Sequence, residues 1–226
     1  MCERDSYYAE PHTQRSEMEL IELNATISDG TNKKIPIDPD LKTVDISNNS
    51  VVVIDLTELE THEGIEELNL SKNNLMTVDL TVLAFCPELR VLLLNANNLR
   101  TVNLDMLRYN ALLEYIDLGF NQIIRVDLTP LSDCKSLVLL NLEKNRLMSL
   151  DVSPLSRCAK LEELNLLENP LKRLDVTPLF SCASLKSLQV PEGIRLTSRV
   201  KQDIEILNPP AINDLIAKDR IEYIFE

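Results

Sequence analysis

The sequence is poor in the residues on which most enzyme chemistry depends. Its 226 residues include two histidines, four glycines and no tryptophan, and aromatic residues make up 4%. Two histidines leave no plausible Ser–His–Asp set, and the few glycines form no phosphate-binding loop or nucleophile elbow. The segment after Val190 is too short for a typical catalytic domain. We therefore predict that the protein is not an enzyme, binds no cofactor and has no metal site.

Long apolar runs are also missing, and the charge is of one sign. No apolar run approaches the ~20 residues of a membrane-spanning helix, and the polar start, 1–16, lacks the apolar core of a signal peptide. The net charge of −13 would repel phosphate backbones and anionic membranes. We expect no nucleic-acid or membrane partner and a cytoplasmic location. The expected partner is a protein with a basic or amphipathic contact surface, and the oligomeric state stays open.

What the sequence has instead is a period of 24 residues. A leucine or isoleucine opens each unit, at Leu41, Ile65, Leu89, Leu113, Leu137, Leu161 and Leu185. The ninth position of each full unit is an asparagine: Asn49, Asn73, Asn97, Asn121, Asn145 and Asn169. A fixed period of this length predicts a solenoid of stacked supersecondary units.

The unit 113–136 shows how one repeat is expected to fold. Ile116 alternates with Tyr115 and Asp117, which is typical of a short strand with one buried face. The Asn121 amide can donate to and accept from main-chain groups at the following turn, so the asparagines of successive units would form a buried ladder. The dipeptide at 129–130, Thr-Pro, predicts a short convex helix with the threonine as N-cap.

The repeats divide the chain into three parts. Residues 1–40 would be a flexible tail, over 1–16, and an N-terminal cap with extended pieces at 19–27 and 35–39. Residues 41–190 would be six full repeats and one partial repeat. Residues 191–226 would be a C-terminal cap with helices at 197–207 and 211–218 and a strand at 221–225.

The pattern Leu-x-x-Leu-x-Leu-x-x-Asn-x-Leu, seen plainly at 161–171, resembles the leucine-rich repeat family over 41–190. The resemblance implies an α/β horseshoe with a concave parallel sheet, short convex helices and, usually, protein binding on the concave face. The second half of the unit, Val-Asp-Leu-Thr-Pro-Leu-x-x-Cys, looks like the intracellular phosphatase-regulator type lengthened by two residues. The expected function is a non-catalytic protein–protein interaction module; the alternative is a regulatory subunit of an intracellular enzyme such as a protein phosphatase.

An apolar group ringed by acids is the candidate partner-binding site on the concave face. The alternation sends these side chains outward or to the rim: Val91, Leu93, Tyr115, Asp117, Phe120, Leu139, Glu143, Glu163 and Leu167. Apolar residues surrounded by charge resemble an interface core with a polar rim. Isolated apolar residues on a surface are also ordinary, so this set is a hypothesis.

Three further patterns each allow a structural and a functional interpretation. Four cysteines share one repeat position, either as small buried side chains or as a thiol ladder: Cys86, Cys134, Cys158 and Cys182. Five aspartates form a column, either as a solvated face or as an oxygen-rich row for calcium: Asp55, Asp79, Asp127, Asp151 and Asp175. The third repeat, 89–112, differs from the repeat pattern at four positions, and either a function or neutral drift would account for the differences: Asn103, Asp105, Met106 and Asn110.

Overall fold

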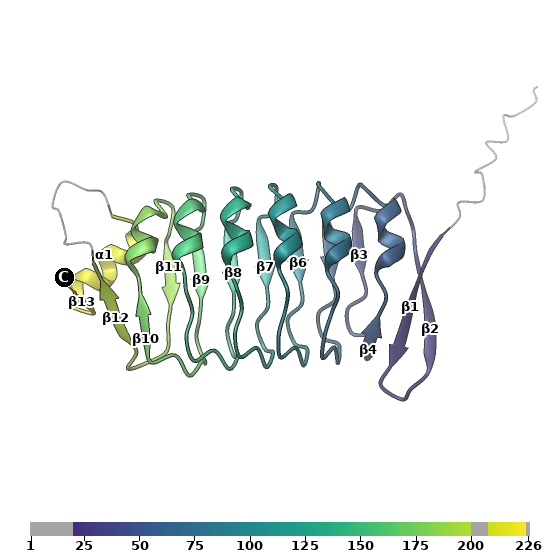
Figure 1. Ribbon diagram of the computed structural model, residues 1–226, viewed down its shortest axis with the longest axis horizontal. Coiled ribbons are helices and arrows are strands. Elements are labelled where there is room, and N and C mark those ends of the chain that lie inside the picture. Colours follow the sequence, from purple (N-terminus) through teal and green to yellow (C-terminus); the bar gives the residue numbers. More distant parts are fainter. Residues whose placement is uncertain (1–19, 200–207, 225–226) are drawn as a thin grey trace, which may run out of the picture.

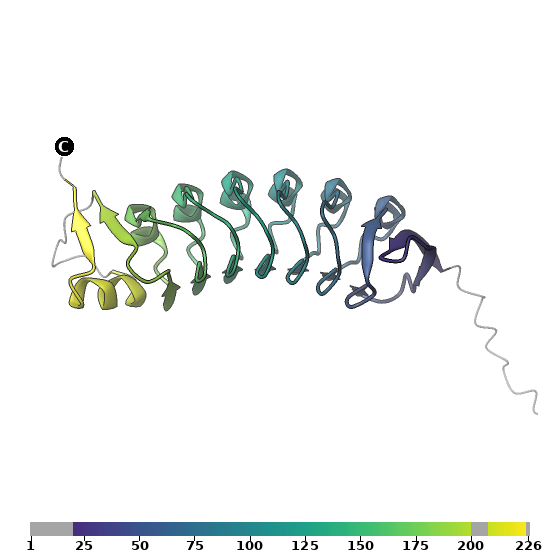
Figure 2. The same ribbon diagram turned by 90° about the horizontal axis from the view of Figure 1, so that it is seen from below.

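The computed structural model describes residues 20–199 and 208–224. The chain forms a single array of coils stacked in sequence order (Figure 1). In Figure 2 the array curves gently, with the parallel strands on the inner side and short helices on the outer side. The predicted solenoid is therefore confirmed.

Seven short parallel strands form the concave sheet, and they follow one another in chain order. They are β3 (Thr43–Asp45), β5 (Glu67–Asn69), β6 (Val91–Leu93), β7 (Tyr115–Asp117), β8 (Leu139–Asn141), β9 (Glu163–Asn165) and β11 (Ser187–Gln189). Each strand pairs with the next at a shift of 24 residues, so that Val91 lies beside Tyr115 and Tyr115 beside Leu139. Ile116, at the centre of β7, is fully buried, as are the corresponding residues from β3 to β9. The alternation predicted from the sequence therefore has the right phase.

Each full repeat carries one helical turn on its convex side, and all six turns are 3-10 helices. They are η1 (Thr57–Thr61), η2 (Thr81–Phe85), η3 (Asp105–Tyr109), η4 (Thr129–Asp133), η5 (Ser153–Arg157) and η6 (Thr177–Ser181). The prediction that threonine caps these helices is wrong. Thr129 is the first helical residue, and its amide donates to Oδ1 of Asp127 at 2.8 Å.

The same bond, from the first helical amide to the side chain two residues before it, starts every convex helix. Its acceptors are Asp55, Asp79, Asn103, Asp127, Asp151 and Asp175. The aspartate column therefore has a structural use that neither proposed interpretation included. Asn103 provides the same oxygen in the third repeat, so this departure from the pattern preserves the bond.

Buried asparagine amides join neighbouring repeats. Oδ1 of Asn121 accepts a hydrogen bond from the amide of Leu99 at 3.0 Å, and its Nδ2 donates to the carbonyls of Leu94 and Leu118 at 3.0 and 3.1 Å. The equivalent bonds recur at Asn97, Asn145 and Asn169. These amides satisfy main-chain groups that the turn would otherwise leave buried and unpaired.

The cysteine column packs beneath the convex helices. Cys86, Cys134, Cys158 and Cys182 are free and buried, and burial raises the pKa of each thiol, to about 12 at Cys134. The Cys134 thiol donates to the carbonyl of Leu107 at 3.3 Å, 27 residues earlier. No group of three or more His, Cys, Asp or Glu side chains within residues 20–199 and 208–224 could hold a metal ion.

A hairpin covers the N-terminal end of the core. Strands β1 (Ile21–Ile27) and β2 (Asn32–Ile37) are antiparallel, and β1 also pairs with β4 (Val51–Ile54). Leu23 and Ile35 are buried in the common core. These strands match the extended pieces expected at 19–27 and 35–39, whereas the tail expected at 1–16 lies outside the described residues.

The C-terminal end adds a second small sheet and one α-helix. Strands β10 (Arg173–Asp175), β12 (Arg195–Ser198) and β13 (Ile221–Tyr223) are parallel, and helix α1 (Pro210–Ala217) buries Ile212. The helix expected from 197 is wrong at its start, because Leu196 pairs with Leu174 and extends the sheet through Ser198; residues 200–207 lie outside the description. No described helix is long and apolar enough to cross a membrane.

Candidate partner-binding face

The concave face consists of the side chains that point out of the seven-stranded sheet. Seven strands with three outward positions each give 21 positions, namely the first and last residue of each strand and the residue two further on. None of the 21 is lysine or arginine, and five are acidic: Asp45, Glu67, Asp117, Glu143 and Glu163. The face is therefore more uniformly acidic than the sequence as a whole.

An apolar group lies across strands β6, β7 and β8 of this face. The strand register brings Val91, Tyr115 and Leu139 side by side, with Leu93 at the other end of β6. Tyr115 is 40% exposed, and the other three are half-buried. The predicted anchors thus form one continuous patch, and exposed Glu163 lies beside Leu139.

The rim next to this patch includes an aromatic ring on a strained backbone. Phe120 has a φ of +56° and is 45% exposed, and Nζ of Lys144 lies 4.9 Å from the centre of its ring. The residue before each ladder asparagine has this left-handed conformation, which costs a side chain with a Cβ roughly 1–2 kcal/mol. At this position the other described repeats have Asn, Lys, Ala or Glu. Phenylalanine gives the bend no local benefit, so its ring at the rim needs another explanation.

A polar network holds the acids beside the apolar patch. Oδ1 of Asp117 accepts from the amide of Gly119 at 2.9 Å and from Nδ2 of Asn141 at 2.8 Å, while Nδ2 of Asn165 donates to Glu143 at 3.1 Å. Burial raises the pKa of Asp117 above its ordinary value, although the two hydrogen bonds act in the opposite direction. Gly119 leaves room for this arrangement, because a Cβ there would lie 2.7 Å from Nδ2 of Asn141.

One strand gives up a bond that its neighbours make. In β3, β5, β7, β8 and β9 the last side chain accepts a hydrogen bond from the amide two residues further on. The side chain of Leu93, at this position in β6, has no oxygen, so the amide of Asn95 lacks that hydrogen bond. Sequence analysis identified Leu93 as apolar but did not recognise that it replaces an acceptor. Half-buried Leu167, two residues beyond β9, extends the apolar surface near Glu143.

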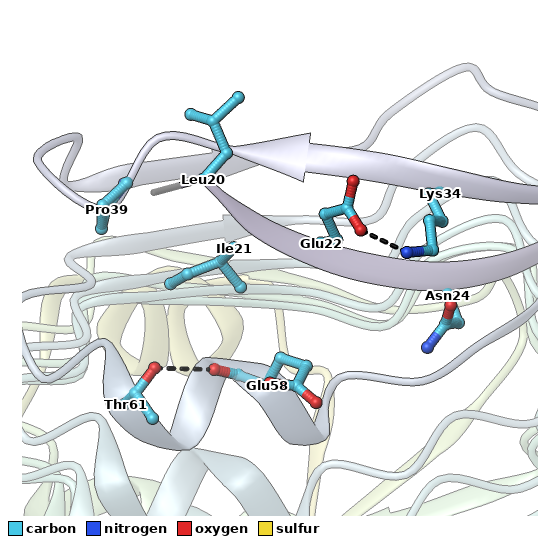
Figure 3. Close-up of a pocket in the computed structure, with 8 residues that line it drawn as sticks. All are labelled: Leu20, Ile21, Glu22, Asn24, Lys34, Pro39, Glu58 and Thr61. Carbon is cyan, nitrogen blue, oxygen red and sulfur yellow. Dashed lines mark hydrogen bonds and ion pairs between the residues drawn. The ribbon is translucent and has the colours of Figure 1, made fainter. Parts of the chain in front are cut away.

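A separate surface cavity lies away from the concave face and does not form this site. Its volume is about 910 Å³, and it lies between the N-terminal hairpin and η1 (Figure 3). Several of its polar side chains already have nearby partners: Glu22 pairs with Lys34 across the hairpin, and the Thr61 hydroxyl donates to the Glu58 carbonyl at 3.0 Å. We give the concave face precedence because it combines apolar anchors with a consistent charge.

The comparison with protein families agrees with this geometry. The family model for the leucine rich repeat matches residues 39–99 and 87–147. The chain belongs to the leucine-rich-repeat family. Proteins built from leucine-rich repeats are generally non-catalytic binding modules. No curated protein matches this sequence closely enough to serve as a relative.

Solved structures of leucine-rich-repeat proteins have the same fold. The ectodomain of the Arabidopsis thaliana receptor kinase GASSHO1/SCHENGEN3, in complex with CASPARIAN STRIP INTEGRITY FACTOR 2, is 25% identical with a TM-score of 0.56, over 64% of this chain and 17% of that one. The Arabidopsis receptor kinase HAESA, with the peptide hormone IDA and the co-receptor SERK1, is 20% identical with a TM-score of 0.61, over 76% and 28%. Internalin inlF from Listeria monocytogenes is 22% identical with a TM-score of 0.51, over 74% and 52%. The chain therefore spans only part of the length of these proteins.

Proposed function

We propose that this leucine-rich-repeat protein is a protein-binding module whose concave face binds a basic, amphipathic protein element. The observation that supports the proposal most directly is the patch of Val91, Leu93, Tyr115 and Leu139 within a face that has five acids and no basic residue. Tyr115 would be the main anchor, because tyrosine is among the residues that dominate binding energy at the centre of an interface. Val91, Leu93 and Leu139 would add buried apolar area around it. The surrounding acids would select a partner of opposite charge and speed the encounter.

The dimensions of the face favour one helix or one small domain as the bound element. Seven strands spaced about 4.8 Å apart span roughly 29 Å, which is the length of about 20 helical residues at 1.5 Å each. An amphipathic helix would place its apolar side on Tyr115 and Leu139. Its basic residues would then approach Asp117, Glu143 and Glu163.

The test compares two tyrosines of similar exposure on opposite sides of the solenoid. Tyr115 is 40% exposed on the concave face, and Tyr109 is 58% exposed at the end of η3 on the convex side. Partner capture from lysate would use the wild type, Tyr115→Asp and the control Tyr109→Asp. We expect some proteins to be retained by both the wild type and Tyr109→Asp but not by Tyr115→Asp. High salt should release the same proteins from the wild type. Equal recovery of every protein by all three would overturn the proposal.

Two finer points of the proposal need separate tests. We propose a cytoplasmic location. The four described cysteines, which are free and buried, support it, and fractionation of cells that express the protein would test it. Regulation of an enzyme such as a phosphatase rests on the resemblance of the repeat type. It would require a captured enzyme whose rate changes when the purified protein is added.

A further inference from the structure

One lateral edge of the solenoid has a charge opposite to that of the concave face. After each concave strand the chain turns back at this edge, which runs along the bottom of Figure 1. Four consecutive turns, 98–101, 122–125, 146–149 and 170–173, contain no Asp or Glu. They contain five exposed basic residues: Arg100, Arg125, Arg146, Lys172 and Arg173. We call these four turns the basic edge.

The cations of the basic edge are not used by the fold. Elsewhere successive repeats pair their charges, as in Lys42–Glu66, Arg90–Glu114 and Lys186–Glu162. Within residues 20–199 and 208–224, no carboxylate lies within 4.0 Å of a basic side-chain nitrogen of the edge. Five unpaired cations concentrated in four turns are unexpected in a chain with a net charge of −13.

Exposed apolar side chains lie among these cations. Ile124 is 52% exposed and Met148 is 74% exposed, at the same position of consecutive turns, next to Arg125 and Arg146. Fully burying such a side chain is worth about 1.5–3 kcal/mol, so leaving both in water forgoes that stabilisation. The combination resembles the apolar centre and charged surround of a binding surface.

The C-terminal end of the basic edge is hollowed. A surface cavity of about 600 Å³ is lined by Ser149 and by the basic residues Arg125, Arg173, Arg195 and Arg199, and also by Asp151 and Asp175, of which Asp175 pairs with Arg199. Arg195 is neutralised by a two-pronged ion pair with Glu222 at 2.5 Å. Arg125 and Arg173 flank Ser149 and keep their guanidinium groups available, and a guanidinium is well shaped to bind a carboxylate through two parallel hydrogen bonds.

We propose that the basic edge is a second docking surface, separate from the concave face, and that it binds a short acidic segment of a protein that also contains apolar residues. Its charge complements carboxylates, and Ile124 and Met148 offer apolar contacts that a purely ionic ligand would not use. A short segment experiences mainly the local field, because charges further than about 8 Å away are screened at physiological salt. Nucleic acid and anionic membranes extend beyond the edge and meet the remaining negative surface, which disfavours them.

The test uses a fluorescent peptide of about 12 residues made mostly of glutamate with two leucines. This peptide, when extended, is longer than the roughly 14 Å across four turns. Fluorescence anisotropy would measure its binding to the whole chain, to Arg125→Glu/Arg146→Glu and to the control Arg157→Glu/Lys160→Glu. Arg157 and Lys160 are exposed near η5, away from the basic edge. Each reversal removes two charges, so both double variants change the net charge from −13 to −17.

We expect the edge variant to bind the peptide about tenfold more weakly and the control to bind within about twofold of the wild type. Ile124→Ser should weaken binding several-fold without a change in net charge, and circular dichroism would verify that each variant is folded. Three results would overturn the proposal: equal weakening in both double variants, equal binding of a glutamine version of the peptide, and no saturable binding by the wild type. Displacement of the peptide by equimolar duplex DNA or phosphatidylserine vesicles would assign the edge to those ligands. That result would also reject the proposal of an acidic protein segment.

Discussion

Replacement of one ladder asparagine tests the claim that side-chain amides hold the repeats together. In Asn121→Ala the amide of Leu99 loses its acceptor and stays buried, at a cost of about 1–3 kcal/mol. The carbonyls of Leu94 and Leu118 each lose one of two donors, since Asn97 and Asn145 also donate to them. Two lost bonds add about 1 kcal/mol each, so we expect a loss of about 3–5 kcal/mol in the free energy of unfolding.

Asn49 at the start of the array provides a matched control. It is half-buried, and its side-chain amide donates only to the carbonyl of Ser47, at 2.8 Å. Asn49→Ala should therefore cost about 1 kcal/mol or less. Urea unfolding followed by far-ultraviolet circular dichroism would measure both variants, because the chain has no tryptophan for fluorescence. If the two losses agree within about 0.5 kcal/mol, the ladder does not hold the repeats together as argued.

Asn121→Asp adds a pH dependence of known sign. A carboxylate can accept from Leu99 but cannot donate, and it would face the carbonyls of Leu94 and Leu118 in a buried site. Burial would raise the folded-state pKa of this carboxyl above its unfolded value of ~3.9. The variant should therefore be most stable below that pH and lose stability as the pH rises through the folded-state pKa.

Three further changes separate structural from surface roles. Asn110→Cys should stabilise the chain by about 1 kcal/mol, visible as a higher urea midpoint. It removes an Oδ1 that is buried without a partner, and a thiol can replace the bond to the Leu83 carbonyl as Cys134 does at its own position, although the bond to the Cys86 carbonyl is lost. Gly119→Ala should destabilise the chain by about 1–2 kcal/mol and break the hydrogen bond from Asn141 to Asp117. The chemical shifts of the Asn141 side-chain amide would report the loss of this bond, and an unshifted signal would contradict the prediction. Asp117→Asn should stabilise the chain at neutral pH, since the raised pKa of Asp117 means that its charged form opposes folding. That gain should vanish below the ordinary pKa of 3.8, so a gain that persists at lower pH would refute the reasoning.

The strand register could be predicted from sequence because one unit repeats. Ile116 and Tyr115 exchange faces only if the register slips by one residue, and that slip would bury the outward side chains of all seven strands at once. Each repeat therefore reinforces the same phase. The same redundancy placed Val91, Tyr115 and Leu139 side by side, although whether they bind a partner stays a prediction.

The remaining features depend on contacts that no local pattern reveals. Thr197 looks like the start of a helix, but the pairing of Leu196 with Leu174 and Ile221 extends a sheet there. Four of the six convex helices begin at a threonine, and in each the aspartate two residues earlier, not the threonine side chain, accepts from the first helical amide. The basic edge was present in the sequence, but the charges of successive turns are 21 to 27 residues apart and become neighbours only once the turns are stacked.

Departures from the repeat pattern fall into two kinds, and the distinction supports the concave face as the functional one. Asn103 replaces an aspartate and keeps its hydrogen bond, and Asn110 replaces a cysteine and still donates to the Leu83 carbonyl, although its Oδ1 is left without a partner. Leu93 and Phe120 do not compensate in this way: one gives up an acceptor for a main-chain amide, and the other places a large ring on a left-handed backbone. Both changes add apolar surface, to strand β6 or to the turn that follows β7. Under the proposed function, the area that a partner buries on this surface would offset the exposure of the Phe120 ring and the hydrogen bond that the Asn95 amide lacks.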